Sequence, residues 1–231
     1  MLIPADFLSG ALMPWVLAAP ALPLAFLLFR KAVFNNLNIA MLIGCIVSML
    51  TNVFINLVVQ QPADLQSNIY LLGLMMEFGV SMILLWNCTY RKLIRGMILA
   101  VGVLFSGALA SLMVLDTTFK DLLIVLNIGY WLIFFLAVFV LMMTAKDSAN
   151  FLTNTPEFWV SAGLMYHFGL IGLLLLIHPG TTPAEWSRNN DFGLMYTIIT
   201  CIRYLMFSAS IMVSMKKFSH NHSSLFHVPE L

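Results

Sequence analysis

The sequence predicts an all-α, polytopic membrane protein with seven transmembrane helices, and three observations support this fold class. Of its 231 residues, 61% are hydrophobic and only 9% are charged, whereas a soluble domain is about 25% charged. Seven stretches reach the roughly 20 apolar residues that a spanning helix needs, and nearly all charges lie between them. This composition disfavours a soluble enzyme and a disordered chain, and a net charge of +1 gives no basic surface for nucleic acid.

The seven predicted spans are joined by short polar segments. They cover residues 11–29, 39–59, 69–89, 96–115, 122–144, 158–178 and 192–215. The first span contains Pro14, Pro20 and Pro23. Because membrane helices tolerate proline, we expect a kink there rather than a break. The chain is therefore interpreted as one transmembrane domain, residues 1–215, followed by a short cytoplasmic tail, residues 216–231.

Lysine and arginine residues are unevenly distributed between the two sides of the predicted membrane domain. One side has only Lys120 and Arg188. The other side has Arg30, Lys31, Arg91, Lys92, Arg95, Lys146, Lys216 and Lys217. Because cytoplasmic loops are enriched in basic residues, this distribution predicts an external N-terminus and a cytoplasmic C-terminus.

Three side chains that a membrane rarely accommodates lie well inside predicted spans: Glu77, His167 and Arg203. At about 1.5 Å per residue, Glu77 lies roughly 12 Å and the other two roughly 16 Å from the outer ends of their helices. These depths are near the middle of a hydrocarbon core about 30 Å thick. An unpaired charge there costs at least about 2.5–3.5 kcal/mol. We therefore expect Glu77 to pair with Arg203, with His167 as a further hydrogen-bonding partner.

Other polar residues extend this cluster along the predicted helices. Tyr196 and Thr200 precede Arg203 at helical spacing and share its face. Asparagines add polar groups in the second and fifth spans. The candidate ligand-binding or switch site therefore consists of Glu77, Arg203, His167, Asn52, Asn56, Asn127, Tyr196 and Thr200. A purely structural interpretation fits the same residues, because a buried ion pair can fix helix register and asparagines can hold membrane helices together.

The fourth span contains a stripe of small residues. Gly102, Ser106 and Ala110 recur at every fourth position, and Gly96 and Ala100 continue the same kind of pattern. Small residues allow another helix to approach closely. The pattern predicts packing within the bundle, with a dimer face as the alternative.

Several membrane chemistries lack the residues they require. A retinal Schiff base needs a lysine inside the bundle, but every lysine lies at a helix end or in a connection. An intramembrane metalloprotease needs HExxH or an equivalent cluster, and His167 is alone in its span. We therefore predict no metal ion, no cofactor and no enzymatic activity. An enzyme acting on lipid is the weakest of the functional hypotheses.

Two segments near the end of the chain resemble a known architecture. The run PEFWVSAGLMYHFGLIGLLLL (Pro156–Leu176) and the run FGLMYTIITCIRYLMF (Phe192–Phe207) resemble the last two helices of bacterial seven-helix membrane regions. Such regions precede some sensor histidine kinases or occur as small stand-alone proteins. The resemblance implies a sensory or signal-coupling role in the bacterial inner membrane. Because this chain ends soon after its seventh helix, the resemblance also implies a separate kinase or other signalling partner.

The predicted function is thus a membrane module that reads a small-molecule or lipid ligand in a polar interior and acts through a protein partner. The alternative is a small solute or proton transporter or channel that uses Glu77, His167 and Arg203. A proton path would require titratable groups in series, and only Glu77 and His167 are available inside the spans.

Overall fold

The chain folds almost entirely into helices in the part that the computed structural model describes, namely residues 14–16, 18–29, 35–58, 63–114, 119–147, 152–177 and 190–225. Side chains are described for residues 14–16, 18–28, 35–51, 53, 72, 73, 75–112, 124–147, 152–177 and 194–216. These ranges contain no β-strand, which confirms the predicted all-α class. The elements are α2 (Ala21–Phe29), α3 (Asn36–Val58), α4 (Ala63–Asn87), α5 (Lys92–Val114), α6 (Phe119–Asp147), the 3₁₀ helix η1 (Leu152–Asn154), α7 (Pro156–Ile177) and α9 (Asn190–Leu225).

Most helices lie close to the predicted spans, and three differ by six residues or more: α2, whose start is described below, α4 and α9. Helix α4 begins at Ala63 rather than at residue 69, and α9 ends at Leu225 rather than at residue 215. Neither proline nor glycine occurs between residue 216 and Pro229. Since these residues are the usual helix terminators, α9 continues past the end of its apolar run. The predicted tail therefore starts as helix.

A turn precedes α2. It comprises Ala19 and Pro20, and the amide of Leu22 donates to the carbonyl of Ala19 at 3.3 Å. Because Pro20 and Pro23 have no N–H, the helical hydrogen bonds that these positions would donate cannot form. The helix is therefore interrupted by this turn and restarts at Ala21, so the expectation of a kink rather than a break is wrong.

Local hydrogen bonds define where α3 and α7 begin. The Asn35 side-chain Oδ1 accepts from the amide of Asn38 at 2.7 Å, which caps the first turn of α3. Pro156 occupies the first position of α7, where a helix has no partner for an N–H. The carbonyl of Thr155 accepts from the amide of Phe158 at 3.2 Å and completes this turn.

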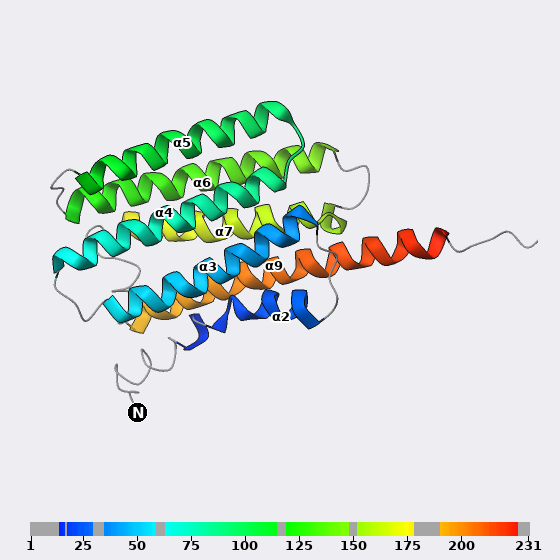
Figure 1. Cartoon of the computed structure of the whole chain (residues 1–231), viewed down its shortest axis with the longest axis horizontal. Helices are drawn as coiled ribbons and strands as arrows, with labels where there is room; N and C mark the ends of the chain where they lie inside the picture. The colour runs from blue at the N-terminus through cyan, green and yellow to red at the C-terminus, as the bar shows by residue number, and fades with distance from the viewer. Residues whose placement is uncertain are drawn as a thin grey trace, which may run out of the picture.

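The helices form a closed ring of contacts. Each of α2, α3, α4, α5, α6, α7 and α9 packs on the next, and α9 returns to α2. Helix α4 also packs on α6 and α7 across the ring. Figure 1 shows the helix axes running in roughly the same direction, with α9 extending past the other helices at one end.

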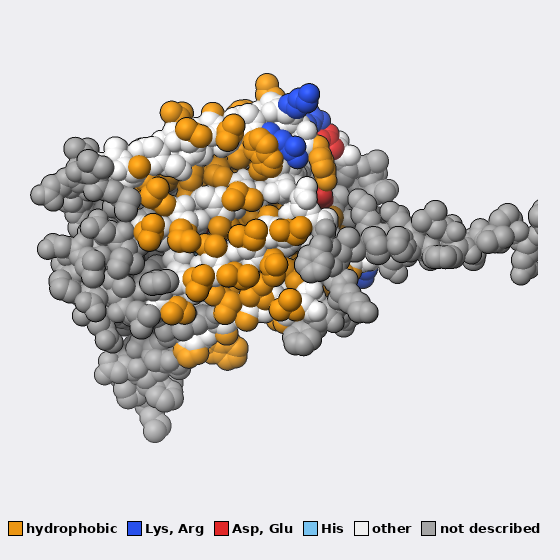
Figure 2. Space-filling view, in the orientation of Figure 1, with side chains coloured by type: hydrophobic (Ala, Val, Ile, Leu, Met, Phe, Trp, Pro, Cys, Tyr) orange, Lys and Arg blue, Asp and Glu red, His pale blue; other side chains and the backbone are white. Residues whose placement is uncertain are grey.

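The bundle has the apolar exterior of a multi-pass membrane protein. Four stretches in the described part of the chain are long and apolar enough to cross a membrane: Lys92–Leu112, Ile124–Asp147, Pro156–Ile177 and Leu194–Lys216. Shorter apolar stretches lie on the other helices: Pro14–Leu28, Asn36–Thr51 and Met75–Asn87. Large hydrophobic side chains are exposed along α3, α5, α6 and α9, and Figure 2 shows them across the middle of the visible face.

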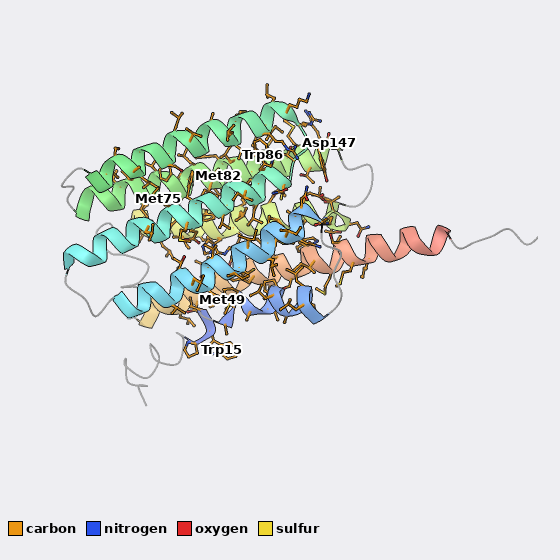
Figure 3. All side chains as sticks on the ribbon, viewed as in Figure 1. Trp15, Met49, Met75, Met82, Trp86 and Asp147 are labelled. Atoms are coloured by element: carbon orange, nitrogen blue, oxygen red, sulfur yellow. The ribbon has the colours of Figure 1, made fainter. Side chains whose placement is uncertain are left out.

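Charged side chains gather at one end of this face (Figure 2). There the end of α4, the start of α5 and the end of α6 meet, and Figure 3 shows Trp86 and Asp147 at this end. Arg91 Nε donates to Asp147 at 3.1 Å. Arg95 donates to the carbonyl of Thr89 at 2.8 Å and lies over the Trp86 ring at 5.3 Å. We call this part of the bundle the basic end.

Candidate functional site

Helices α4, α7 and α9 bring Glu77, His167 and Arg203 together. Arg203 Nη1 donates to Glu77 Oε1 at 2.7 Å. His167 Nε2 lies 3.6 Å from the same carboxylate oxygen. The structure therefore places the three residues as the sequence predicts, and one carboxylate joins three helices. We call these three residues the ion cluster.

The ion cluster is deep in the bundle and is accessible mainly at Glu77. His167 lies near the middle of α7, roughly 15 Å from either end at about 1.5 Å per residue. Its side chain is 2% exposed and that of Arg203 is 7% exposed, whereas that of Glu77 is 28% exposed. A small molecule that reaches the cluster would therefore meet the carboxylate first.

Tyr204 is a further member of the site that was not among the predicted residues. Arg203 Nη2 donates to the Tyr204 hydroxyl at 2.7 Å, and the guanidinium carbon lies 4.7 Å from the centre of its ring. Adjacent residues on a helix point about 100° apart, so Tyr204 did not share the polar stripe of Arg203. The signal for this contact is only its position next to a buried arginine.

Two nitrogen atoms in the site, one in the Arg203 guanidinium and one in the His167 ring, have unused hydrogen-bonding capacity. Arg203 Nε is buried and makes no hydrogen bond with the described residues. His167 Nδ1 is also buried and has no hydrogen-bond partner among the described residues. Buried polar groups in proteins are nearly always satisfied. These two nitrogens are therefore where a polar ligand or an ordered water would find a partner.

Close packing of α7 on α9 positions Arg203. A Cβ added at Gly163 would lie 3.2 Å from Phe207, 3.3 Å from Met206 and 3.4 Å from the carbonyl oxygen of Arg203. Two of these distances are shorter than ordinary Cβ contacts, so a larger residue would require its neighbours to shift by a few tenths of an ångström. The absence of a side chain at Gly163 thus allows the backbone of α9 to approach α7 closely at Arg203.

Two serines of α9 hold this helix to its neighbours. Ser210 donates to the carbonyl of Pro156 at 2.9 Å, and Ser214 accepts from the Asn35 amide at 3.2 Å. Both contacts lie between the ion cluster and the basic end. They hold α9 to the start of α7 and to the residue that caps α3.

Replacing Ser210 with alanine is expected to lower the free energy of unfolding by about 0.6 kcal/mol, and by no more than about 1.7 kcal/mol, the range for interhelical hydrogen bonds in membranes. Unfolding in mixed micelles with increasing dodecyl sulfate, followed by circular dichroism, measures this change. Ser111→Ala is the matched control, because Ser111 bonds only within its own helix, to the carbonyl of Ala108. Equal losses in the two variants would contradict an interhelical role for Ser210.

The remaining predicted site residues divide into three groups. Thr200 is buried and Tyr196 half-buried on α9, and Tyr196 is within electrostatic range of Glu77 and Arg203. Asn127 lies on α6, and its buried Oδ1 has no hydrogen-bond partner among the described residues. The side chains of Asn52 and Asn56 lie outside the described residues.

The chemistry of the site is electrostatic. No group of three histidine, cysteine or acidic residues that could hold a metal ion occurs among the described side chains. A guanidinium is charged at every physiological pH, whereas a carboxylate and an imidazole can exchange protons. The site therefore combines one permanent cation with two groups that can change charge. An anionic or polar ligand could compete with Glu77 for the guanidinium.

No protein family, characterised protein or solved structure shows significant similarity to this chain. The functional argument therefore starts from the geometry of the ion cluster and of the helices that carry it.

Proposed function

We propose that this protein is a sensory or signal-coupling module of the bacterial inner membrane with seven transmembrane helices. In this proposal α2 to α7 and α9 all cross the membrane, the N-terminus is outside and the basic end faces the cytoplasm. A small-molecule or lipid ligand acts at the ion cluster, and a separate kinase or other signalling protein receives the signal. The closed ring of helices and the basic side chains at one end of the described part of the bundle support this topology.

One observation carries the proposal: the cation of the ion cluster belongs to the helix that leaves the bundle. Arg203 lies on α9, which is the longest described helix and continues to Leu225 beyond the basic end (Figure 1). A change in the pairing of Arg203 changes what holds α9 against α4 and α7. Helix shifts of about 1–2 Å at such contacts are a common form of signal transmission. The projecting end of α9 is the natural surface for a partner.

The unused nitrogens support a ligand with oxygen acceptors. Arg203 donates to Glu77 and Tyr204 and keeps Nε–H free among the described residues. Arginine binds carboxylates and phosphates through paired N–H donors. A carboxylate or phosphate group of a ligand would therefore replace Glu77 as the partner of the guanidinium.

Weakening the ion cluster is expected to move α9 without unfolding the bundle. We would attach spin labels to cysteines introduced at Lys92 and Lys216, two exposed positions on α5 and α9, after replacing the native cysteines with alanine. Pulsed electron resonance then gives the distance between them in lipid nanodiscs. Glu77→Gln is expected to shift this distance by about 1–2 Å or more, because it removes the charge that holds Arg203.

The control for this measurement is Glu157→Gln. Glu157 is a carboxylate in the first turn of α7 and makes no contact with the ion cluster in the described structure. It should leave the distance unchanged. An unchanged distance in Glu77→Gln, with the protein still folded by circular dichroism, would contradict the coupling of the cluster to α9.

A second candidate function, transport of protons or a small solute, is favoured by a different observation. The Glu77 carboxylate is partly accessible and lies 3.6 Å from His167, a second group that can exchange protons. Proton flux into liposomes that is lost in Glu77→Gln and in His167→Ala but kept in Glu157→Gln would favour transport. Sensing predicts no flux in any of these proteins.

The proposed orientation has its own test. A cysteine at Lys216 or Lys92 is expected to react with a membrane-impermeant maleimide only after the cells are permeabilised. A cysteine at Thr181, in the connection before α9, is expected to react in intact cells. The opposite labelling pattern would contradict the proposed orientation and indicate the inverted one.

A further inference from the structure

A groove runs between α4 and α5 on the outside of the bundle, apart from the ion cluster. Its volume is about 650 Å³. Nearly all of its lining is apolar, and the main lining residues are Phe78, Met82 and Trp86 of α4 and Ile98, Gly102 and Ser106 of α5. Its rim is open, because Ile83, Leu99 and Val103 are 51%, 57% and 64% exposed.

Small residues keep this groove open. A Cβ added at Gly79 would meet nothing within 4 Å, and one added at Gly102 would meet only Met82, at 3.7 Å. The sequence predicted that the small-residue stripe of α5 brings another helix close. The structure does not show such a close approach at Gly102. Gly102 and Ser106 instead line the groove, and Gly96, Ala100 and Ala110 are exposed.

The length of the groove matches one leaflet of a membrane. From Phe78 to Trp86 on α4, and from Ile98 to Ser106 on α5, it extends roughly 12 Å at about 1.5 Å per residue. Half of a hydrocarbon core about 30 Å thick is roughly 15 Å. Figure 3 shows Met82 toward the middle of α4 and Trp86 nearer the basic end. The groove thus starts near mid-depth and ends at the basic end.

Two cationic side chains, Arg95 and Lys92, lie where the groove reaches the basic end. Arg95 lies over the rings of Trp86 and Tyr90, at 5.3 and 5.8 Å, and Trp86 lines the groove. Lys92 is exposed one helical turn before Arg95. Neither cation has an acidic partner within 4 Å in the described part of the chain, whereas Arg91 pairs with Asp147.

From this arrangement we infer that the groove between α4 and α5 binds one anionic phospholipid from the leaflet at the basic end. An acyl chain lies along the apolar groove, and the phosphate of the headgroup meets Arg95 and Lys92. The lining favours a hydrocarbon chain because the only polar side-chain groups among its described residues are the hydroxyl of Ser106 and the indole N–H of Trp86. The unpaired cations favour a negative headgroup over a neutral one.

Native mass spectrometry of the purified full-length protein tests the inference. The probes are phosphatidylglycerol and phosphatidylcholine with identical acyl chains, added to the protein in detergent. Wild type is expected to bind phosphatidylglycerol about fivefold more tightly, the contribution of one basic residue at a membrane surface. Arg95→Gln is expected to remove most of this preference. Equal binding of the two lipids by wild type would overturn the inference.

A matched pair of variants tests the acyl-chain part of the site. Gly102→Leu places a side chain in the groove and is expected to reduce bound phosphatidylglycerol to the level of phosphatidylcholine. Gly107→Leu makes the same change on the same helix at an exposed position with nothing within 4 Å. It should bind lipid like wild type. If the two variants bind phosphatidylglycerol equally well, the groove is not the site.

A measurement on the unmodified protein keeps the inference testable if a variant does not fold. Phosphatidylglycerol with a photoreactive diazirine in one acyl chain is incorporated into nanodiscs with wild type, irradiated, and the labelled peptides are sequenced. Labelling is expected on residues 78–86 and 98–106, the segments that line the groove. Labelling spread evenly over α3, α6 and α9, or equal labelling by the phosphatidylcholine probe, would overturn the inference.

Discussion

Replacing Glu77 with glutamine is expected to destabilise the protein by about 3 kcal/mol or more, the typical cost of removing one partner of a buried ion pair. Glutamine keeps the shape of the side chain and one acceptor oxygen, so the loss reports the charge. Arg203 has no other carboxylate within 4 Å among the described residues, and a guanidinium cannot release its charge. A buried cation therefore remains without its counterion.

The converse substitution is expected to be milder. Arg203→Met leaves Glu77 without its cation, but a carboxylate that is 28% exposed can take up a proton and become neutral. We expect a loss of about 1–3 kcal/mol, the cost of leaving a buried polar group without its partner. The double variant Glu77→Gln, Arg203→Met carries no charge at either position. It should lose less than the sum of the two single variants.

Unfolding in mixed micelles with increasing dodecyl sulfate gives all three free energies. Glu157→Gln serves as the matched control and should cost less than about 1 kcal/mol, the range for an acidic residue near the start of a helix. Two results would contradict the argument. One is a loss in Glu77→Gln no larger than in Glu157→Gln, and the other is full additivity in the double variant.

Replacing Gly163 with leucine is expected to be the most damaging change in the packing between α7 and α9. The new Cβ would lie 3.2 Å from Phe207 and 3.3 Å from Met206, closer than ordinary contacts, and 3.4 Å from the Arg203 carbonyl oxygen, and leucine adds three further carbon atoms beyond it. Overpacking of this kind costs about 1–3 kcal/mol and occasionally more, and we expect the upper end. Because α9 is pushed away at Arg203 itself, the ion cluster should weaken together with the helix contact.

The matched control for this variant is Gly107→Leu on α5. Both changes raise helix propensity by the same amount, but a Cβ at Gly107 meets nothing within 4 Å. Stability in dodecyl sulfate should fall, and the distance between labels at Lys92 and Lys216 should change, only in Gly163→Leu. If the two variants behave alike, the contact of α7 with α9 does not position Arg203.

The fold and the ion cluster were predictable because a membrane interior restricts what a sequence can do. Long apolar runs must be helical to satisfy their backbone groups, so the positions of most helices followed from composition alone. Each of two opposite charges in an apolar interior needs a counterion, so the pairing of Glu77 with Arg203 followed from their similar predicted depth. His167 was placed beside them by the same reasoning.

Other features depend on neighbours that no local pattern specifies. Tyr204 joins the site because of the conformation of the Arg203 side chain, and Gly163 matters because of which helix faces it. At Gly102 and Ser106 the sequence pattern instead predicted a helix contact that the structure lacks. Small residues allow close approach but do not require it, and here they leave a groove. The continuation of α9 to Leu225 likewise reflects the absence of a terminator rather than an apolar signal.

The closing contact of the ring has a consequence for how the protein is made. The ring closes between α2 and α9, so this contact forms only after α9 has been synthesised. Glu77 is synthesised well before Arg203, and a carboxylic acid can remain neutral until its partner arrives. Arg203, which cannot lose its charge, is synthesised when its counterion is already in place. Because Glu77 precedes Arg203 along the chain, the bundle does not have to hold an unpaired arginine charge while it is being assembled.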